Sequence, residues 1–165
     1  MILLLANGSM PTTAKFALAQ TGTSIKTLLQ VKGLVPLKVI EWGISFPASA
    51  AAAPPAVELL TTGTVFATVT ALAEADVSKF GAAADLAADI LTFGTSATGF
   101  TSTSEGSITA TKILDGPAQI PPTAYFSKQF PLDQEPIIYK GDSGRIRVTS
   151  AVDYAVYCWL KLKAA

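Results

Sequence analysis

The sequence predicts an all-β fold, namely an antiparallel β-sandwich of jelly-roll-like type. Apolar and polar residues alternate with a period of two along several short runs. Gly, Pro, Asp and Ser separate these runs, as turn residues separate strands. The runs number roughly nine or ten, which fits two stacked sheets better than one open sheet.

The start of the chain is predicted to stand apart from the sandwich. Four consecutive apolar residues at positions 2–5 precede the flexible sequence at positions 7–9. This apolar run is shorter than the central region of a secretion signal, so we expect no such signal. We expect residues 1–10 to form an N-terminal arm and residues 11–165 to form a single β-sandwich domain.

The alternation of apolar and polar residues predicts each strand separately. It is strictest at residues 40–46, 145–149 and 152–162, and turn chemistry at Asp142-Ser143-Gly144 precedes the second of these. The core side chains predicted from these three strands and their flanks are Trp42, Ile44, Phe46, Ile146, Val148, Tyr154, Val156 and Cys158. Weaker alternation predicts strands at residues 13–20, 24–32, 56–61, 64–72, 107–114, 123–130 and 136–140.

Three segments lack the strand pattern. Residues 47–55 are small and include two consecutive prolines, which predicts a loop across one end of the sandwich. Residues 82–91 contain helix formers with Leu86 and Ile90 four apart, which predicts one short helix. Residues 94–106 are rich in Thr, Ser and Gly and predict an extended loop or a hairpin tip.

The composition argues against several classes of function. Lys and Arg together number 12, as do Asp and Glu, so the chain lacks the net basic field of a nucleic-acid binder. No stretch approaches the roughly 18 apolar residues of a membrane helix. We therefore expect neither nucleic acid nor membrane among its partners. Only 15% of the residues are charged and half are hydrophobic, which suits a surface partly covered by neighbouring molecules.

The sequence also lacks most catalytic and metal-binding chemistry. It contains no His and a single Cys, Cys158, which excludes a Ser-His-Asp triad, a Cys-His dyad and an ordinary zinc site. We interpret the closest carboxylate pairs as solvated side chains or as residues of turns, and not as an acid and base for glycoside hydrolysis. These pairs are Glu74 with Asp76, Asp85 with Asp89, and Asp133 with Glu135. We predict that the protein is not an enzyme and has no catalytic residue, cofactor or metal.

Eight residues are predicted to lie at an interface with other chains. Arg145 and Arg147 would project together from the outer face of one strand. There they would bind a carboxylate of a partner chain or a phosphate, or they would simply belong to an ordinary solvated face of the sheet. Tyr157 and Trp159 would be subunit contacts on the outer face of the last strand, unless both of its faces are buried. The apolar run of the arm would anchor the chain on a neighbour and supplies the other four residues, Ile2, Leu3, Leu4 and Leu5.

Five segments carry a resemblance to a known family. They are Glu41-Trp42-Gly43-Ile44-Ser45-Phe46, Val57-Glu58-Leu59-Leu60, Ala67-Thr68-Val69-Thr70, Phe130-Pro131-Leu132 with Glu135-Pro136, and Arg145-Ile146-Arg147-Val148-Thr149. These strand and turn signatures resemble small virion proteins of tailed bacteriophages, particularly those that infect actinobacteria. The resemblance spans about residues 37–160, and the sequence departs from the family's pattern at residues 48–53 and 80–100.

The resemblance implies a capsid decoration, or cement, protein that binds the outside of the major capsid lattice and stabilises the head. Its partner would be the major capsid protein, and it would commonly form a homotrimer. It would be made in the host bacterial cytoplasm and reside on the outer capsid surface of the virion. The alternative is a tail-associated or host-surface-binding module, whose exposed loops, such as residues 94–106, would contact a receptor or a surface glycan.

Overall fold

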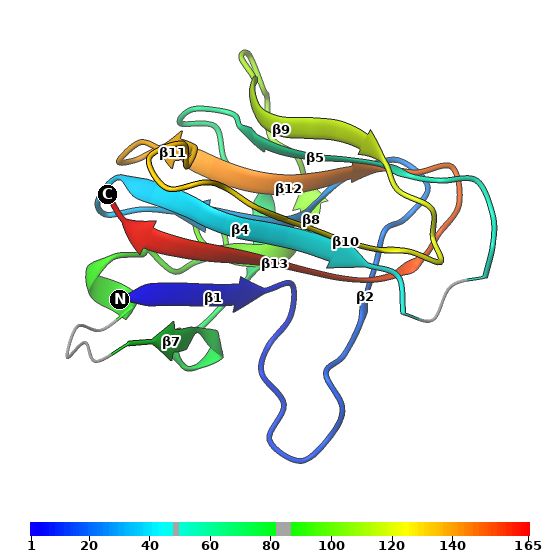
Figure 1. The fold of residues 1–165 in the computed structure, drawn as a ribbon, viewed down its shortest axis with the longest axis horizontal. Coiled ribbons are helices and arrows are strands. Elements are labelled where there is room, and N and C mark those ends of the chain that lie inside the picture. Colours follow the sequence, from blue (N-terminus) through cyan, green and yellow to red (C-terminus); the bar gives the residue numbers. More distant parts are fainter. Residues whose placement is uncertain (48–49, 82–86) are drawn as a thin grey trace.

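The chain forms two antiparallel β-sheets that pack face to face, as Figure 1 shows. The computed structural model describes residues 1–47, 50–81 and 87–165. A single hydrophobic cluster draws side chains from both sheets. The prediction of an all-β sandwich is therefore confirmed.

The sheets contain seven and six strands, and we call them the seven-stranded and the six-stranded sheet. The seven-stranded sheet has the order β10 (Tyr125–Gln129), β4 (Leu37–Ser45), β13 (Ala155–Ala164), β1 (Ile2–Ala6) and β7 (Ser78–Phe80), with β11 (Ile137–Ile138) beside β4 and β2 (Ala19–Gln20) beside β13. The six-stranded sheet has the order β6 (Thr68–Ala71), β8 (Gly99–Ser104), β3 (Ile25–Lys32), β12 (Ser143–Thr149), β5 (Ala56–Thr61) and β9 (Lys112–Gln119). Among the described residues, no two paired strands are consecutive in the sequence, so the chain crosses repeatedly between the sheets.

The interior is built from the inward faces that alternation predicted. All eight predicted core side chains are buried, which confirms the assignment of faces. On β13, for example, Val156, Cys158 and Leu160 are fully buried because every second side chain of a strand points to the same face. Burial raises the pKa of the Cys158 thiol, which keeps it protonated and unreactive at neutral pH.

Residues 1–10 do not form a separate arm. The strand β1 pairs with β13 on one side and with β7 on the other, and Leu3 and Leu5 are fully buried in the chain's own core. Asn7 continues the contact, because its side-chain oxygen accepts a hydrogen bond from the backbone N–H of Cys158 at 2.9 Å. The expectation of an arm was wrong because an unbroken apolar run also suits a strand paired on both edges, here with one face in the core and the other half-buried.

Half of the helix predicted at residues 82–91 lies outside the described residues. Residues 82–86 are not described, and residues 87–89 form η2, a single 3-10 turn. A second 3-10 turn, η1 (Glu74–Asp76), was not predicted. In the part of the chain that the structure describes, no helix has the length and apolarity to cross a membrane.

Two segments differ from their predicted structure. Residues 94–106 were predicted to be an extended loop or a hairpin tip, yet they contain β8, which lies between β6 and β3. Gly99 begins this strand, and a Cβ added there would lie 2.3 Å from the carbonyl oxygen of Thr70, so only glycine permits the pairing. Residues 13–20 form a strand only at β2, and the rest belongs to the long loop between β1 and β2 that extends from the sandwich in Figure 1.

Asp115 on β9 joins the two sheets at one edge. Its Oδ2 accepts a hydrogen bond from Nε1 of Trp42 at 2.8 Å, and its Oδ1 accepts one from Nζ of Lys128 at 2.6 Å. Trp42 lies on β4 and Lys128 on β10, so one carboxylate of the six-stranded sheet holds two strands of the seven-stranded sheet. The same Trp42 ring packs against Phe126, with 5.0 Å between ring centroids.

Glu135 forms ion pairs with Lys38 and Lys163, and their contribution to stability depends on pH. Its pKa is lowered by a hydrogen bond from its own backbone N–H and by the positive charges of Lys163 and Lys38, which outweigh the cost of desolvation. The carboxylate lies 3.3 Å from Nζ of Lys163 and 3.5 Å from Nζ of Lys38. A lowered pKa in the folded state means that the ionised form stabilises folding above the unfolded-state pKa, and this contribution is lost as the pH falls through the folded-state value.

We therefore expect Glu135→Gln to lower the free energy of unfolding at neutral pH, and we expect this deficit to shrink below about pH 4.3, the ordinary glutamate value. Urea titrations of both proteins across this range measure the deficit. The control is Asp133→Asn, an exposed carboxylate of the same loop, which should give no such trend. A Glu135→Gln deficit that stays constant through the acid range would show that charge is not its cause.

Candidate functional site

Four aromatic side chains gather on the outer face of the seven-stranded sheet, and we call them the aromatic shelf. They are Phe16, Tyr125, Tyr157 and Trp159. The Trp159 ring stacks on Tyr125 and on Tyr157, with 5.3 and 5.5 Å between ring centroids. Phe16 meets the edge of Tyr157 at 5.3 Å, so the long loop after β1 completes the shelf.

Gly43 makes room for the shelf. It lies in the middle of β4, where Trp159 is its partner in the register with β13. A Cβ added at Gly43 would lie 2.1 Å from Cζ2 of the Trp159 ring. A glycine inside a strand commonly marks such a close approach, and here it lets the indole lie directly over the backbone of the neighbouring strand.

The shelf is accessible through its tyrosines and not through its tryptophan. Trp159 is only 4% exposed, whereas Tyr125 is 68% exposed. Desolvation raises the pKa of Tyr157, with smaller contributions from Cys158 and Tyr125, so its hydroxyl remains a proton donor at neutral pH. Trp159 is therefore not itself an exposed contact, and it agrees with the alternative that this face of the strand is covered, because the two tyrosines stack on it.

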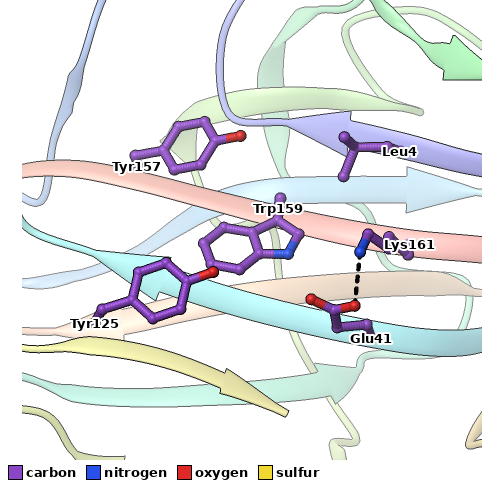
Figure 2. A pocket seen from close by; sticks show the side chains of 6 residues that line it. All are labelled: Leu4, Glu41, Tyr125, Tyr157, Trp159 and Lys161. Atoms are coloured by element: carbon purple, nitrogen blue, oxygen red, sulfur yellow. Dashed lines mark hydrogen bonds and ion pairs between the residues drawn. The ribbon is translucent and has the colours of Figure 1, made fainter. Parts of the chain in front are cut away.

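A shallow hollow of about 180 Å³ lies beside the shelf, as Figure 2 shows. Its six lining residues are Leu4, Glu41, Tyr125, Tyr157, Trp159 and Lys161. Nζ of Lys161 donates to Oε2 of Glu41 at 2.7 Å, so an ion pair closes the end of the hollow opposite the two tyrosines. Strands β1, β4, β10 and β13 each supply at least one of these residues, so four paired strands hold the hollow.

Arg145 does not form the external clamp that its strand position suggested. It lies on the outer face of β12, yet its side chain is fully buried. Nη2 donates to the carbonyl oxygen of Val65 at 2.6 Å, and Nη1 lies 3.3 Å from Oε2 of Glu105. Desolvation lowers its pKa, and the charge of Glu105 opposes this effect. The segments before β6 and after β8 supply these partners and cover the arginine.

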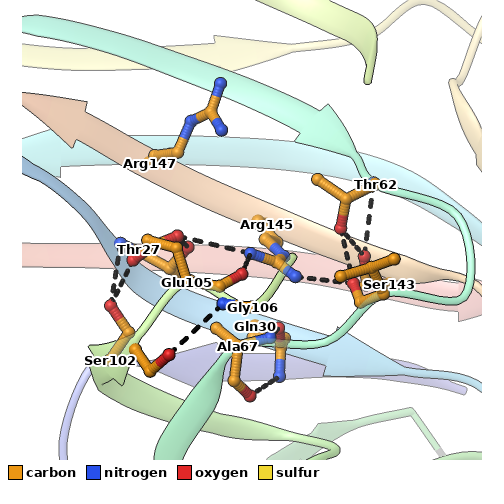
Figure 3. Close-up of polar contacts among 12 residues, drawn as sticks. Thr27, Gln30, Thr62, Ala67, Ser102, Glu105, Gly106, Ser143, Arg145 and Arg147 are labelled. Carbon is orange, nitrogen blue, oxygen red and sulfur yellow. Dashed lines mark hydrogen bonds and ion pairs between the residues drawn. The ribbon is translucent and has the colours of Figure 1, made fainter. Parts of the chain in front are cut away.

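Glu105 connects Arg145 to β3 and β8, as Figure 3 shows. The backbone N–H of Thr27 donates to Oε1 and its hydroxyl donates to Oε2, both at 2.6 Å. The hydroxyl of Ser102 also donates to Oε1. Arg147, the second predicted clamp residue, instead pairs with Glu58 on β5 at 2.6 Å. The outer face of the six-stranded sheet is thus closed at these positions by partners from the same chain.

The four apolar residues of the expected anchor divide between the two faces of β1. Leu3 and Leu5 point into the core, whereas Ile2 and Leu4 are half-buried on the other face. Leu4 is the one that lines the hollow. An anchor made of all four side chains is therefore excluded by the burial of two of them.

Three carboxylates of the predicted pairs, Glu74, Asp76 and Glu135, have structural partners. Glu74 accepts hydrogen bonds from Nζ of Lys79 and from the backbone N–H of Ala87, and Asp76 accepts from the backbone N–H of Met10 at 2.8 Å. Asp85 lies outside the described residues. The structure places no three His, Cys, Asp or Glu side chains together as a possible metal site among residues 1–47, 50–81 and 87–165.

Sequence reasoning missed Tyr125, Glu41, Lys161 and Phe16 as members of a site. Each is unremarkable alone, because the proximity of Tyr125, Glu41 and Lys161 depends on the register between β10, β4 and β13, and Phe16 comes from the loop after β1. The one local signal was Gly43, an unexplained glycine in the middle of an otherwise strict strand. Comparison with family models, curated proteins and solved structures finds no match to this chain.

Proposed function

We propose that the chain is a structural virion protein of a tailed bacteriophage, without enzymatic activity, that decorates the outside of the major capsid lattice as a homotrimer. The proposal follows from the resemblance of its strand segments to small phage virion proteins. It is supported by a sandwich in which several carboxylates, among them Glu105, Asp115 and Glu135, serve structural contacts. One further observation carries it, namely a group of uncovered apolar side chains at one end of the sandwich.

We call this group the apolar end, and it consists of Leu34, Ile137 and Tyr139. Leu34 and Tyr139 are exposed, and Ile137 and Tyr139 line a hollow of about 260 Å³. Gly33, the residue before Leu34, is joined to this region by a hydrogen bond from the backbone N–H of Gly141 to its carbonyl oxygen at 3.3 Å. Figure 1 shows β11, which carries Ile137, at the same end of the sandwich as the C-terminus.

Such an end suits attachment to a large lattice. Moving exposed apolar groups out of water is favourable. The hollow at this end is also lined by Lys112 and Asp142, whose opposite charges leave it without a net charge. A protein that binds the assembled lattice and not its separated parts stabilises the assembly by mass action. Many identical copies then multiply a modest affinity per copy.

The test is occupancy on particles. Tyr139→Ser combined with Leu34→Ser should weaken binding to capsids about tenfold or more, because each buried apolar side chain contributes about 1.5–3 kcal/mol. The measurement is the amount of chain that cosediments with capsids stripped of it, as its concentration is varied. Tyr125→Ser is the matched control, since it removes an equally exposed tyrosine from a different face. Equal binding by the unaltered chain, the double variant and Tyr125→Ser would contradict attachment through the apolar end.

The alternative is a tail-associated or host-surface module. Antibodies against the purified chain distinguish the two when they are applied to whole particles and imaged. Label over the head supports decoration, and label confined to the tail supports the alternative.

A further inference from the structure

We propose that the hollow beside the aromatic shelf binds one neutral hexopyranose ring of a glycan. This inference does not depend on the virion role, because it concerns the isolated domain. The inference is based on three groups that line one small hollow, namely the exposed ring of Tyr125, the hydroxyl of Tyr157 and the ion pair of Glu41 with Lys161. These are the groups that a sugar ring requires, since a hexopyranose has apolar C–H faces and a rim of hydroxyl groups.

The apolar half of the site is Tyr125. The residue is 68% exposed, and its ring is held in place by stacking on Trp159. Trp159 is itself fixed between two tyrosines above Gly43, so the shelf is ordered before any ligand arrives. A preordered aromatic face can pack against the C–H face of a sugar without the entropy cost of immobilising a mobile side chain.

The polar half of the site is the pair of Glu41 and Lys161. The pair uses Oε2 of Glu41, and no hydrogen bond from the described residues reaches Oε1, which can accept from a sugar hydroxyl. Nζ of Lys161 has three N–H donors and gives one to Glu41. Adjacent hydroxyls of a hexopyranose can donate to one partner and accept from the other. The protonated hydroxyl of Tyr157 adds a further donor at the rim.

Size and charge favour a sugar over other occupants. A hollow of about 180 Å³ is smaller than the roughly 300 Å³ at which sites for drug-sized molecules begin, which fits a single ring. Six lining residues are far fewer than the roughly 20–30 per side of a stable protein interface. The charges of Glu41 and Lys161 cancel, so the hollow offers no net attraction for a phosphate or an acidic sugar.

The site is built to bind and not to cleave. Glycoside hydrolysis ordinarily requires two carboxyl groups on either side of the scissile bond. Glu41 is the only carboxylate among the six lining residues, and it is paired with a lysine.

Saturation-transfer NMR on the purified chain tests this inference. The probes are four neutral oligosaccharides, namely cellohexaose, maltohexaose, mannohexaose and chitohexaose, each up to about 10 mM, a range that detects millimolar affinity. We expect transfer to at least one of them. Tyr125→Ser should weaken that binding about tenfold or more, and Glu41→Gln should weaken it to a smaller degree. Tyr139→Ser, at the apolar end, should leave it unchanged.

Three results would overturn the inference. The first is no transfer to any of the four oligosaccharides, and the second is transfer that Tyr125→Ser does not alter. The third is a change in the sedimentation mass of Tyr125→Ser relative to the unaltered chain, which would show that a second copy occupies the shelf. Tyr125 is exposed, so the variant should keep its fold, and an unchanged far-UV circular dichroism spectrum verifies this. Capsid binding by the same variant separates failure of this inference from failure of the virion role.

Discussion

Replacing Trp42 by alanine should lower the free energy of unfolding by about 3–5 kcal/mol, the usual cost of removing a large aromatic side chain from a packed core. The side chain is fully buried and contacts Phe126. The change also removes the hydrogen bond to Asp115, which leaves that carboxylate with Lys128 as its one remaining partner among the described side chains. Chemical denaturation of both proteins measures the loss.

A matched variant separates packing from hydrogen bonding in this result. Trp42→Phe keeps an aromatic ring in the core but cannot donate to Asp115, so it should cost less, about 1–3 kcal/mol. Wild-type stability in Trp42→Ala would mean that β4 has its two faces reversed. Equal losses in both variants would mean that the bond to Asp115, and not the packing, holds this edge of the sandwich.

Leu3→Ala and Leu5→Ala should each lower the free energy of unfolding by about 2–5 kcal/mol, because both side chains are fully buried between the sheets. Leu4→Ala, on the opposite face of the same strand, should cost about 1 kcal/mol. The three variants remove the same atoms from adjacent positions, so the contrast reports only the face of β1. Denaturation midpoints with unchanged slopes give the comparison.

The opposite pattern would restore the idea of a separate arm. If β1 lay outside the core, all three substitutions would leave the stability of the sandwich nearly unchanged and would act only on binding to partners. Such a result would contradict the pairing of β1 with β13 and β7.

The strict alternation around Trp42, Ile146 and Cys158 was sufficient to predict three strands and the face that each buries. Alternation states which face a residue is on, but it does not state what covers that face. Arg145 was therefore placed correctly on an outer face and incorrectly in solvent, because Glu105 and Val65 come from segments far away in the sequence. The apolar run at the start of the chain has no alternation at all, and its identity as an inner strand depends on two neighbours, β13 and β7.

The candidate site was predictable only in part, for a related reason. Tyr157 and Trp159 stood out as aromatic residues on one face of a single strand. Their partners Tyr125 and Glu41 belong to two other strands, and only the pairing of those strands brings the four side chains to one hollow. Register between distant strands is a property of the folded sheet and leaves little trace in any one segment.

The most direct test of the proposed role is a reconstruction of purified particles at a resolution that separates β-strands. The account predicts three copies of the sandwich around a threefold axis on the outer surface of the head, with Leu34 and Tyr139 toward the capsid lattice and Tyr125 toward solvent. A particle without the chain, or with the chain only in the tail, would contradict it.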